Sequence, residues 1–74
     1  MYVRDYFVEM RLLPEAEGGG WMASVPDLPG CMSDGDTIEQ AAVNVGDAID
    51  CWVDAAHRLG RDVPRPTADE RRRA

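Results

Sequence analysis

The sequence predicts an α+β fold in which a three-stranded antiparallel sheet carries one long α-helix, packed on one of its faces. Before residue 37, apolar residues alternate with polar ones, which is typical of half-buried strands. From residue 37 to residue 59, apolar residues recur at steps of three and four, as they do on one face of a helix. At 74 residues the chain has room for one domain only, and its thin core favours self-association.

Two strands joined by a glycine-rich loop are predicted first. The first strand is expected at about residues 5 to 13, and the second at about residues 20 to 26. Glycines at positions 18 to 20 mark a hairpin loop, so the two strands should be antiparallel. The inward face of the first strand consists of Tyr6, Val8, Met10 and Leu12.

Two apolar residues, Phe7 and Met22, are out of phase with the main apolar stripes of these strands. They fall on the sheet face that the single helix leaves uncovered. Leaving apolar surface in water instead of burying it costs a free energy of roughly 25 cal/mol per Å². We therefore expect a homo-oligomer, either a dimer or a tetramer.

A stiff corner is predicted after the second strand, at Pro26-Asp27-Leu28-Pro29-Gly30-Cys31. Its two prolines lack a backbone N–H and hold φ near about −65°, which excludes a helix interior or a central strand. Gly30 can adopt the positive φ of a type II turn. A short third strand is expected at about residues 31 to 34. Gly35 and Asp36 then mark a turn.

The long helix is expected at about residues 37 to 59. Thr37 is suited to the N-cap, Gln40 completes a capping box, and Gly60 is suited to the C′ position. Gly46 lies at the edge of the apolar stripe, where close approach of a neighbour is one reason to place glycine in a helix. The apolar stripe consists of Ile38, Ala41, Ala42, Val45, Ala48, Ile49, Trp52, Ala56 and Leu59. The opposite side carries Asp47, Asp50 and Asp54.

The charge is unevenly distributed along the chain. Residues 1 to 60 carry 11 acids against 3 arginines, whereas residues 61 to 74 carry 5 arginines against 3 acids. The acidic body disfavours nucleic acid and favours a basic protein partner. A membrane span and a signal peptide are not expected, so a cytoplasmic location is predicted. Two cysteines without metal-ligand spacing predict neither a disulfide framework nor a metal or other cofactor.

Candidate catalytic groups are few. The carboxylates of Asp27, Asp34 and Asp36 could hold Mg²⁺ for a ribonuclease-like reaction, but each also suits a turn or the approach to a helix. His57 has no nucleophile arranged near it in the sequence, and Cys51 falls on the outer half of the helix. No catalytic residue is assigned, and an enzyme is not expected. The acidic row on the helix is either a solvated face or a partner-binding face.

The order of these motifs resembles the HicB-like antitoxins over about residues 6 to 66. The resemblance rests on Trp21-x-Ala23-x-Val25, the proline corner, and Gly35-Asp36-Thr37-x-Glu39-x-Ala41. It implies a partial ribonuclease-H-like fold without that nuclease's active site. It also implies direct binding of HicA, a small basic mRNA-cleaving toxin, with its catalytic histidine covered.

Many members of that family also carry a C-terminal DNA-binding domain. Only eight residues follow Pro66 here, so a short form is expected, without direct DNA binding by this chain. Residues 1–66 are predicted to form the antitoxin domain and residues 67–74 a charged, disordered tail. The predicted function is an antitoxin-like module that neutralises a HicA-type toxin. The alternatives are a metal-dependent ribonuclease-like activity and an orphan structural module that has lost its toxin.

Overall fold

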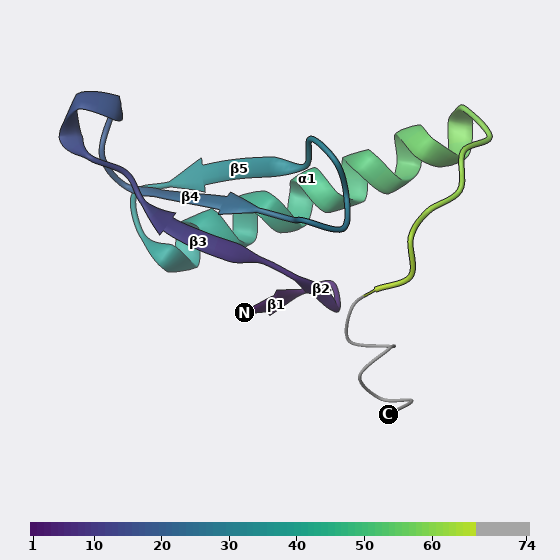
Figure 1. Cartoon of the computed structure of the whole chain (residues 1–74), viewed down its shortest axis with the longest axis horizontal. Coiled ribbons are helices and arrows are strands. Elements are labelled where there is room, and N and C mark those ends of the chain that lie inside the picture. Colours follow the sequence, from purple (N-terminus) through teal and green to yellow (C-terminus); the bar gives the residue numbers. More distant parts are fainter. Residues whose placement is uncertain (67–74) are drawn as a thin grey trace.

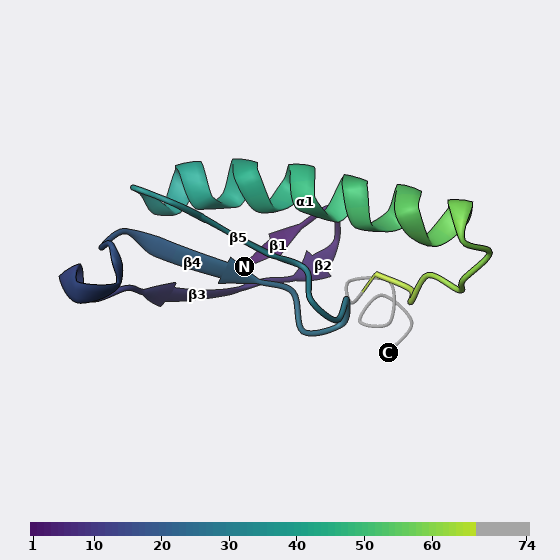
Figure 2. The ribbon, with the colours of Figure 1, turned by 90° about the horizontal axis from the view of Figure 1, so that it is seen from above.

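The structure, a computed structural model, describes residues 1–66 and consists of a helical layer over a sheet layer (Figures 1 and 2). The strands β3, β4 and β5 form an antiparallel sheet in that order, and the helix α1 packs on β5 and β4. This arrangement confirms the predicted α+β fold. The predicted tail, residues 67–74, lies outside the described residues. The elements are β1 (Tyr2–Val3), β2 (Tyr6–Phe7), β3 (Glu9–Leu12), the 3₁₀ helix η1 (Glu15–Glu17), β4 (Trp21–Ser24), β5 (Met32–Gly35) and α1 (Ile38–Arg58).

The two faces of the sheet follow from its register. Met10, Ala23 and Ser33 are paired across the three strands, and Ala23 is fully buried under the helix. Successive residues of a strand point to opposite faces. The neighbouring rows, which contain Met22 and Ser24, therefore point away from α1. Within residues 1–66, no helix combines the length and the apolarity that a membrane span requires.

The prediction of one continuous strand at about residues 5 to 13 is wrong. Residues 5 to 13 are divided between β2, which pairs with β1 in a separate hairpin, and β3, which pairs with β4. The hairpin turns through Arg4 and Asp5, whose φ values are 51° and 67°. Asn-Gly or Asp-Gly usually marks such a two-residue turn, and neither pair occurs here. The sequence therefore gave no signal for this hairpin.

Two leucines near the end of β3 exchange their predicted roles. Leu12 was assigned to the buried face but is 63 % exposed, whereas Leu13 is only 8 % exposed. The reason is the position of the helix, which covers β5 and β4 and leaves the edge strand β3 largely uncovered. Leu13 follows the strand, and its N–H donates to the carbonyl of Gly20 over 2.8 Å.

Both ends of α1 form as predicted. The Thr37 hydroxyl accepts a hydrogen bond from the N–H of Gln40 (3.0 Å), and the Gln40 side chain accepts one from the N–H of Asp36 (2.7 Å). Gly60, at φ 67°, ends the helix in a Schellman arrangement, in which its N–H and that of Arg61 donate to the last turn. Leu59, predicted to lie on the buried stripe, is 68 % exposed because the helix extends beyond the sheet (Figure 1).

Helix and sheet meet most closely at Gly35. A Cβ atom at this position would lie 2.5 Å from the backbone nitrogen of Ala41, so only glycine fits without moving the helix. The predicted turn at Gly35 is wrong, because this residue is the last of β5. The side-chain amide of Asn44 donates to the carbonyl of Asp34 (2.8 Å) and adds a second link between the layers. This close approach sets the position of α1 on the sheet.

Candidate partner-binding surface

The proline corner consists of two consecutive turns. The N–H of Leu28 donates to the carbonyl of Val25 (3.1 Å), and the N–H of Cys31 donates to the carbonyl of Leu28 (2.9 Å). Gly30 has a φ of 81°, as the predicted type II turn requires. Pro29 precedes it at the position where proline suits this turn. The corner is therefore held by its own backbone.

Two side chains of the corner, those of Leu28 and Cys31, are buried in the core. Leu28 is fully buried and belongs to the same apolar cluster as Val45 and Ile49 of the helix. Cys31 is also buried, and this burial raises the pKa of its thiol. The raised pKa favours the neutral thiol, which is a poor nucleophile. In contrast, Pro26, Asp27, Pro29 and Gly30 are exposed and present the outer surface of the corner.

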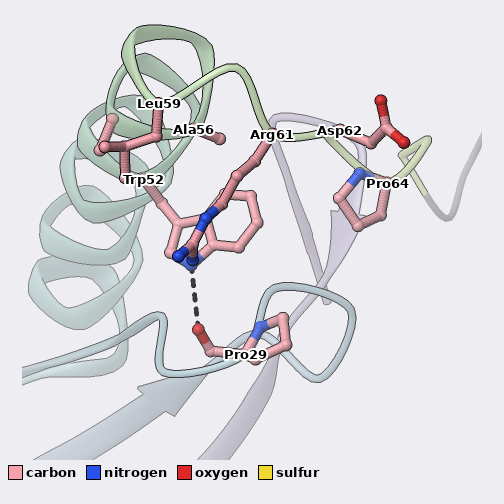
Figure 3. Close-up of a pocket in the computed structure, with 8 residues that line it drawn as sticks. Pro29, Trp52, Ala56, Leu59, Arg61, Asp62 and Pro64 are labelled. Atoms are coloured by element: carbon pink, nitrogen blue, oxygen red, sulfur yellow. Dashed lines mark hydrogen bonds between the residues drawn. The ribbon is translucent and has the colours of Figure 1, made fainter.

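The corner is tied to the C-terminal half of α1 by Trp52. The indole Nε1 of Trp52 donates a hydrogen bond to the carbonyl of Pro29 over 2.9 Å (Figure 3). The segment after the helix is tied down as well, because the Tyr6 hydroxyl donates to the carbonyl of Pro64 over 2.6 Å. The Trp52–Pro29 bond joins residues that are 23 positions apart in the chain, and the Tyr6–Pro64 bond joins residues that are 58 positions apart.

A pocket of about 450 Å³ lies between these three segments (Figure 3). Most of its lining is apolar, and its charged groups, Arg61 and Asp62, come from the segment after the helix. Trp52 and Leu59 were predicted to lie on the buried stripe of the helix, but both line this pocket. The lining residues are Pro29, Trp52, Ala55, Ala56, Leu59, Arg61, Asp62 and Pro64.

The acidic row of the helix is exposed, as predicted, but two of its three members hold ion pairs. Asp50 accepts two hydrogen bonds from the Arg4 guanidinium, at 3.1 and 3.0 Å, which lower the pKa of Asp50 and raise the pKa of Arg4. Asp54 pairs with Arg58 at 2.7 Å. Within residues 1–66, Asp47 has no ion pair. The bare negative charge of this row is therefore smaller than the sequence suggests.

Arg4 reaches Asp50 across Gly46. A Cβ atom on Gly46 would lie 3.3 Å from the Arg4 side chain, so glycine leaves room for the guanidinium to lie against the helix. The close neighbour expected at Gly46 is therefore Arg4. Arg4 lies 46 residues before Asp50 in the chain, so the local sequence pattern could not predict this contact.

The other candidate groups are dispersed. Asp27 lies in the corner, Asp34 in β5 and Asp36 before the helix. Among the residues that the structure describes, no group of three His, Cys, Asp or Glu side chains is placed to hold a metal ion. His57 and Cys51 are exposed on α1. The carboxylates of Asp27, Asp34 and Asp36 are thus not brought together as one group within residues 1–66.

Comparison with known proteins assigns the family. The family described as HicB-like antitoxin of bacterial toxin-antitoxin system matches residues 10–74. The chain belongs to the HicB-like antitoxin family. A UPF0150 protein of Thermoplasma acidophilum is 30% identical to it over 59 residues, which cover 80% of this chain and 86% of that protein. A UPF0150 protein of Synechocystis sp. is 37% identical over 54 residues, which cover 73% and 68% of the two chains.

A third relative of this HicB-like antitoxin is longer. An uncharacterized 14.9 kDa protein of Haemophilus phage HP1 is 35% identical over 51 residues, which cover 69% of this chain but 38% of the phage protein. No solved structure matches the chain significantly. The family match includes the proline corner, the segment from Gly35 to Thr37 and α1, whereas the hairpin β1–β2 precedes it. The matched range therefore includes the segments that line the pocket and those that make the close helix–sheet contact.

Proposed function

We propose that this chain neutralises a HicA-type mRNA-cleaving toxin by binding it directly. The observation that carries the proposal is the HicB-like antitoxin match over residues 10–74, which contains the whole corner and helix. The proposal includes a homo-oligomer, a cytoplasmic location, and a partial ribonuclease-H-like topology that lacks a nuclease site. It assigns no direct DNA binding to this chain.

The pocket beside Trp52 is the surface that we assign to the toxin. Tryptophan is enriched among the residues that dominate binding energy at protein interfaces, and such residues act best when they are held in place before binding. The bond from Trp52 to Pro29 provides this restraint. Leu59, which is 68 % exposed at the pocket, adds apolar area for a partner to cover.

The acidic body supports the same partner through its long-range field. Residues 1 to 60 carry an excess of acids, and a basic toxin is attracted by this field before contact. Asp47, Asp50 and Asp54 form one exposed part of it, reduced by the pairs with Arg4 and Arg58. Such steering acts mainly on the association rate. Salt screens it over about 8 Å at physiological ionic strength.

The central test measures toxin neutralisation by variants of the pocket. The purified toxin encoded beside this chain should lose its RNA-cleaving activity when the parent chain is added. Leu59→Arg should weaken binding by about tenfold or more, since it places a cation where an apolar anchor docks. Val43→Arg is the matched control, because Val43 is 66 % exposed on the same helix but does not line the pocket. Equal binding by both variants would remove the pocket from the proposal.

Steering is tested separately with Asp47→Lys. This residue holds no ion pair within residues 1–66, so its reversal removes no partner of the Arg4–Asp50 or Asp54–Arg58 pair, although the Asp47 charge also acts on Arg4. The association rate with the toxin should fall at low salt and converge with the parent rate at high salt. An unchanged rate at low salt would make this helix face a solvated surface only.

Two outcomes would overturn the proposal as a whole. RNA cleavage by the purified chain with Mg²⁺, lost in Asp36→Asn, would favour the ribonuclease-like alternative. Absence of a neighbouring gene for a small basic toxin, together with no binding to HicA-type toxins, would favour an orphan module. Circular dichroism of each variant establishes that the fold persists.

A further inference from the structure

The sheet face that points away from α1 is uncovered and mixed in character. Two rows of paired residues form it, and these rows are Glu9–Ser24–Met32 and Arg11–Met22–Asp34. Their neighbours in the register, such as the fully buried Ala23, face the helix instead. We call the two exposed rows the outer sheet face.

The outer sheet face has a hollow on one side and a protruding side chain on the other. The hollow, of about 560 Å³, lies over β3 and β4 and is lined in part by Phe7, Arg11 and Met22. Met32, in β5, does not line the hollow and is 54 % exposed. Phe7 is held in place by an edge-to-face contact with Tyr2, with ring centroids 5.8 Å apart. A hollow and a flexible apolar side chain thus lie on the same face of one chain.

Two opposite charges of this face, on Arg11 and Asp34, lie on either side of β4, whereas Glu9 lies across β4 from the apolar Met32. Arg11 and Asp34 lie at opposite ends of one row, with Met22 between them. Consider two copies with their outer sheet faces together, related by a two-fold axis that runs parallel to β4 between the faces. This axis places the β3 strand of one copy opposite the β5 strand of the other. It therefore brings Arg11 of each copy opposite Asp34 of its partner. The same rotation brings Met32 of each copy over the hollow of the partner.

We propose that two copies of this chain pack their outer sheet faces together around such an axis, to form a dimer. A two-fold interface uses the same patch on both subunits, so this patch must be complementary to itself. The outer sheet face meets that condition in charge, through Arg11 and Asp34, and in shape, through Met32 and the hollow. Stacked sheets of this kind pack about 10 Å apart with nearly aligned strands.

This interface leaves the helix layer of the molecule free. The helix α1 lies on the opposite side of the sheet from the outer sheet face (Figure 2). A dimer built in this way presents two helices on its outside. The inference specifies the oligomer of the proposed function, but the dimer itself requires no toxin, and its association is tested with the full chain alone.

Analytical ultracentrifugation of the full chain is the test. The parent chain should be a dimer at tens of micromolar. Met32→Glu should raise the dimer dissociation constant by about tenfold or more, because it places a carboxylate over the hollow that Glu9 of the second copy also lines. Val43→Glu, at an apolar residue on α1 that is 66 % exposed, should leave the constant unchanged.

A charge exchange tests the geometry. Arg11→Asp and Asp34→Arg should each weaken the dimer, since each places like charges opposite one another. The double variant with both substitutions should return the dissociation constant to within about threefold of the parent value, since it restores opposite charges across the interface. Circular dichroism of all variants should show the parent helix content.

Three results would overturn the inference. The first is a monomeric parent chain at tens of micromolar. The second is a double variant that associates no better than the single variants. The third is a Met32→Glu variant that loses toxin binding but stays dimeric, which would make the outer sheet face the toxin's surface instead.

Discussion

The indole nitrogen of Trp52 and the carbonyl oxygen of Pro29 are 2.9 Å apart, and this hydrogen bond joins the helix to the proline corner. The two residues come from segments with different local conformations, one helical and one a tight turn. Their bond makes the corner, the last turns of α1 and the pocket between them a single unit. A change at Trp52 should therefore affect both stability and partner binding.

Trp52→Phe keeps an aromatic ring but removes the N–H donor. The Pro29 carbonyl then loses its partner, and the free energy of unfolding should fall by about 0.5–1.5 kcal/mol in urea denaturation. Trp21→Phe is the matched control, because the Trp21 indole has no such bond within residues 1–66. Equal losses in both variants would show that ring size, and not the hydrogen bond, is responsible.

Gly35→Ala should destabilise the fold by about 1–3 kcal/mol, since the added Cβ would lie 2.5 Å from the Ala41 nitrogen and the helix would have to move. Gly46→Ala provides the contrast. Its added Cβ would meet the end of the flexible Arg4 side chain at 3.3 Å, while alanine favours the helix by about 1 kcal/mol. Thermal unfolding should therefore place the Gly46 variant close to the parent. The reverse order of stability would contradict this account of the helix–sheet contact.

Ile49→Ala should lower the free energy of unfolding by about 2–5 kcal/mol, enough to unfold much of a domain this small. Ile49 is 2 % exposed in the centre of the helix–sheet interface. Val43→Ala, on the exposed side of the same helix, should change stability by less than about 0.5 kcal/mol. Circular dichroism with urea measures both, and a small effect at Ile49 would indicate a different packing of α1.

The Arg4–Asp50 pair predicts a dependence of stability on pH. The Arg4 guanidinium lowers the pKa of Asp50, so the folded state favours the carboxylate. This contribution is fully present above the unfolded pKa of about 3.9 and is lost as the pH falls through the lower folded pKa. Asp50→Asn should therefore have a lower melting temperature than the parent at pH 7, and the difference should shrink below about pH 4. A difference that stays constant with pH would remove the ion pair as its cause.

Local chemistry was sufficient to predict the helix and the corner. Thr37 and Gly60 mark the ends of α1 through hydrogen bonds that span a few residues, and Gly30 adopts the positive φ that its turn demands. The stripe of apolar residues at helical spacing identified the buried face at Ala41, Val45 and Ile49. Each of these features depends only on neighbours within about one turn of chain.

The tertiary structure alone decided which apolar residues are covered and which distant groups meet. Leu12 is exposed and Leu13 is buried because α1 lies over β4 and β5, a placement that depends on the close contact at Gly35. The Arg4–Asp50 pair spans 46 residues, and no periodicity of the sequence relates such distant positions. Contacts of this kind form only after the layers pack, since the packing brings together groups that the local pattern cannot connect.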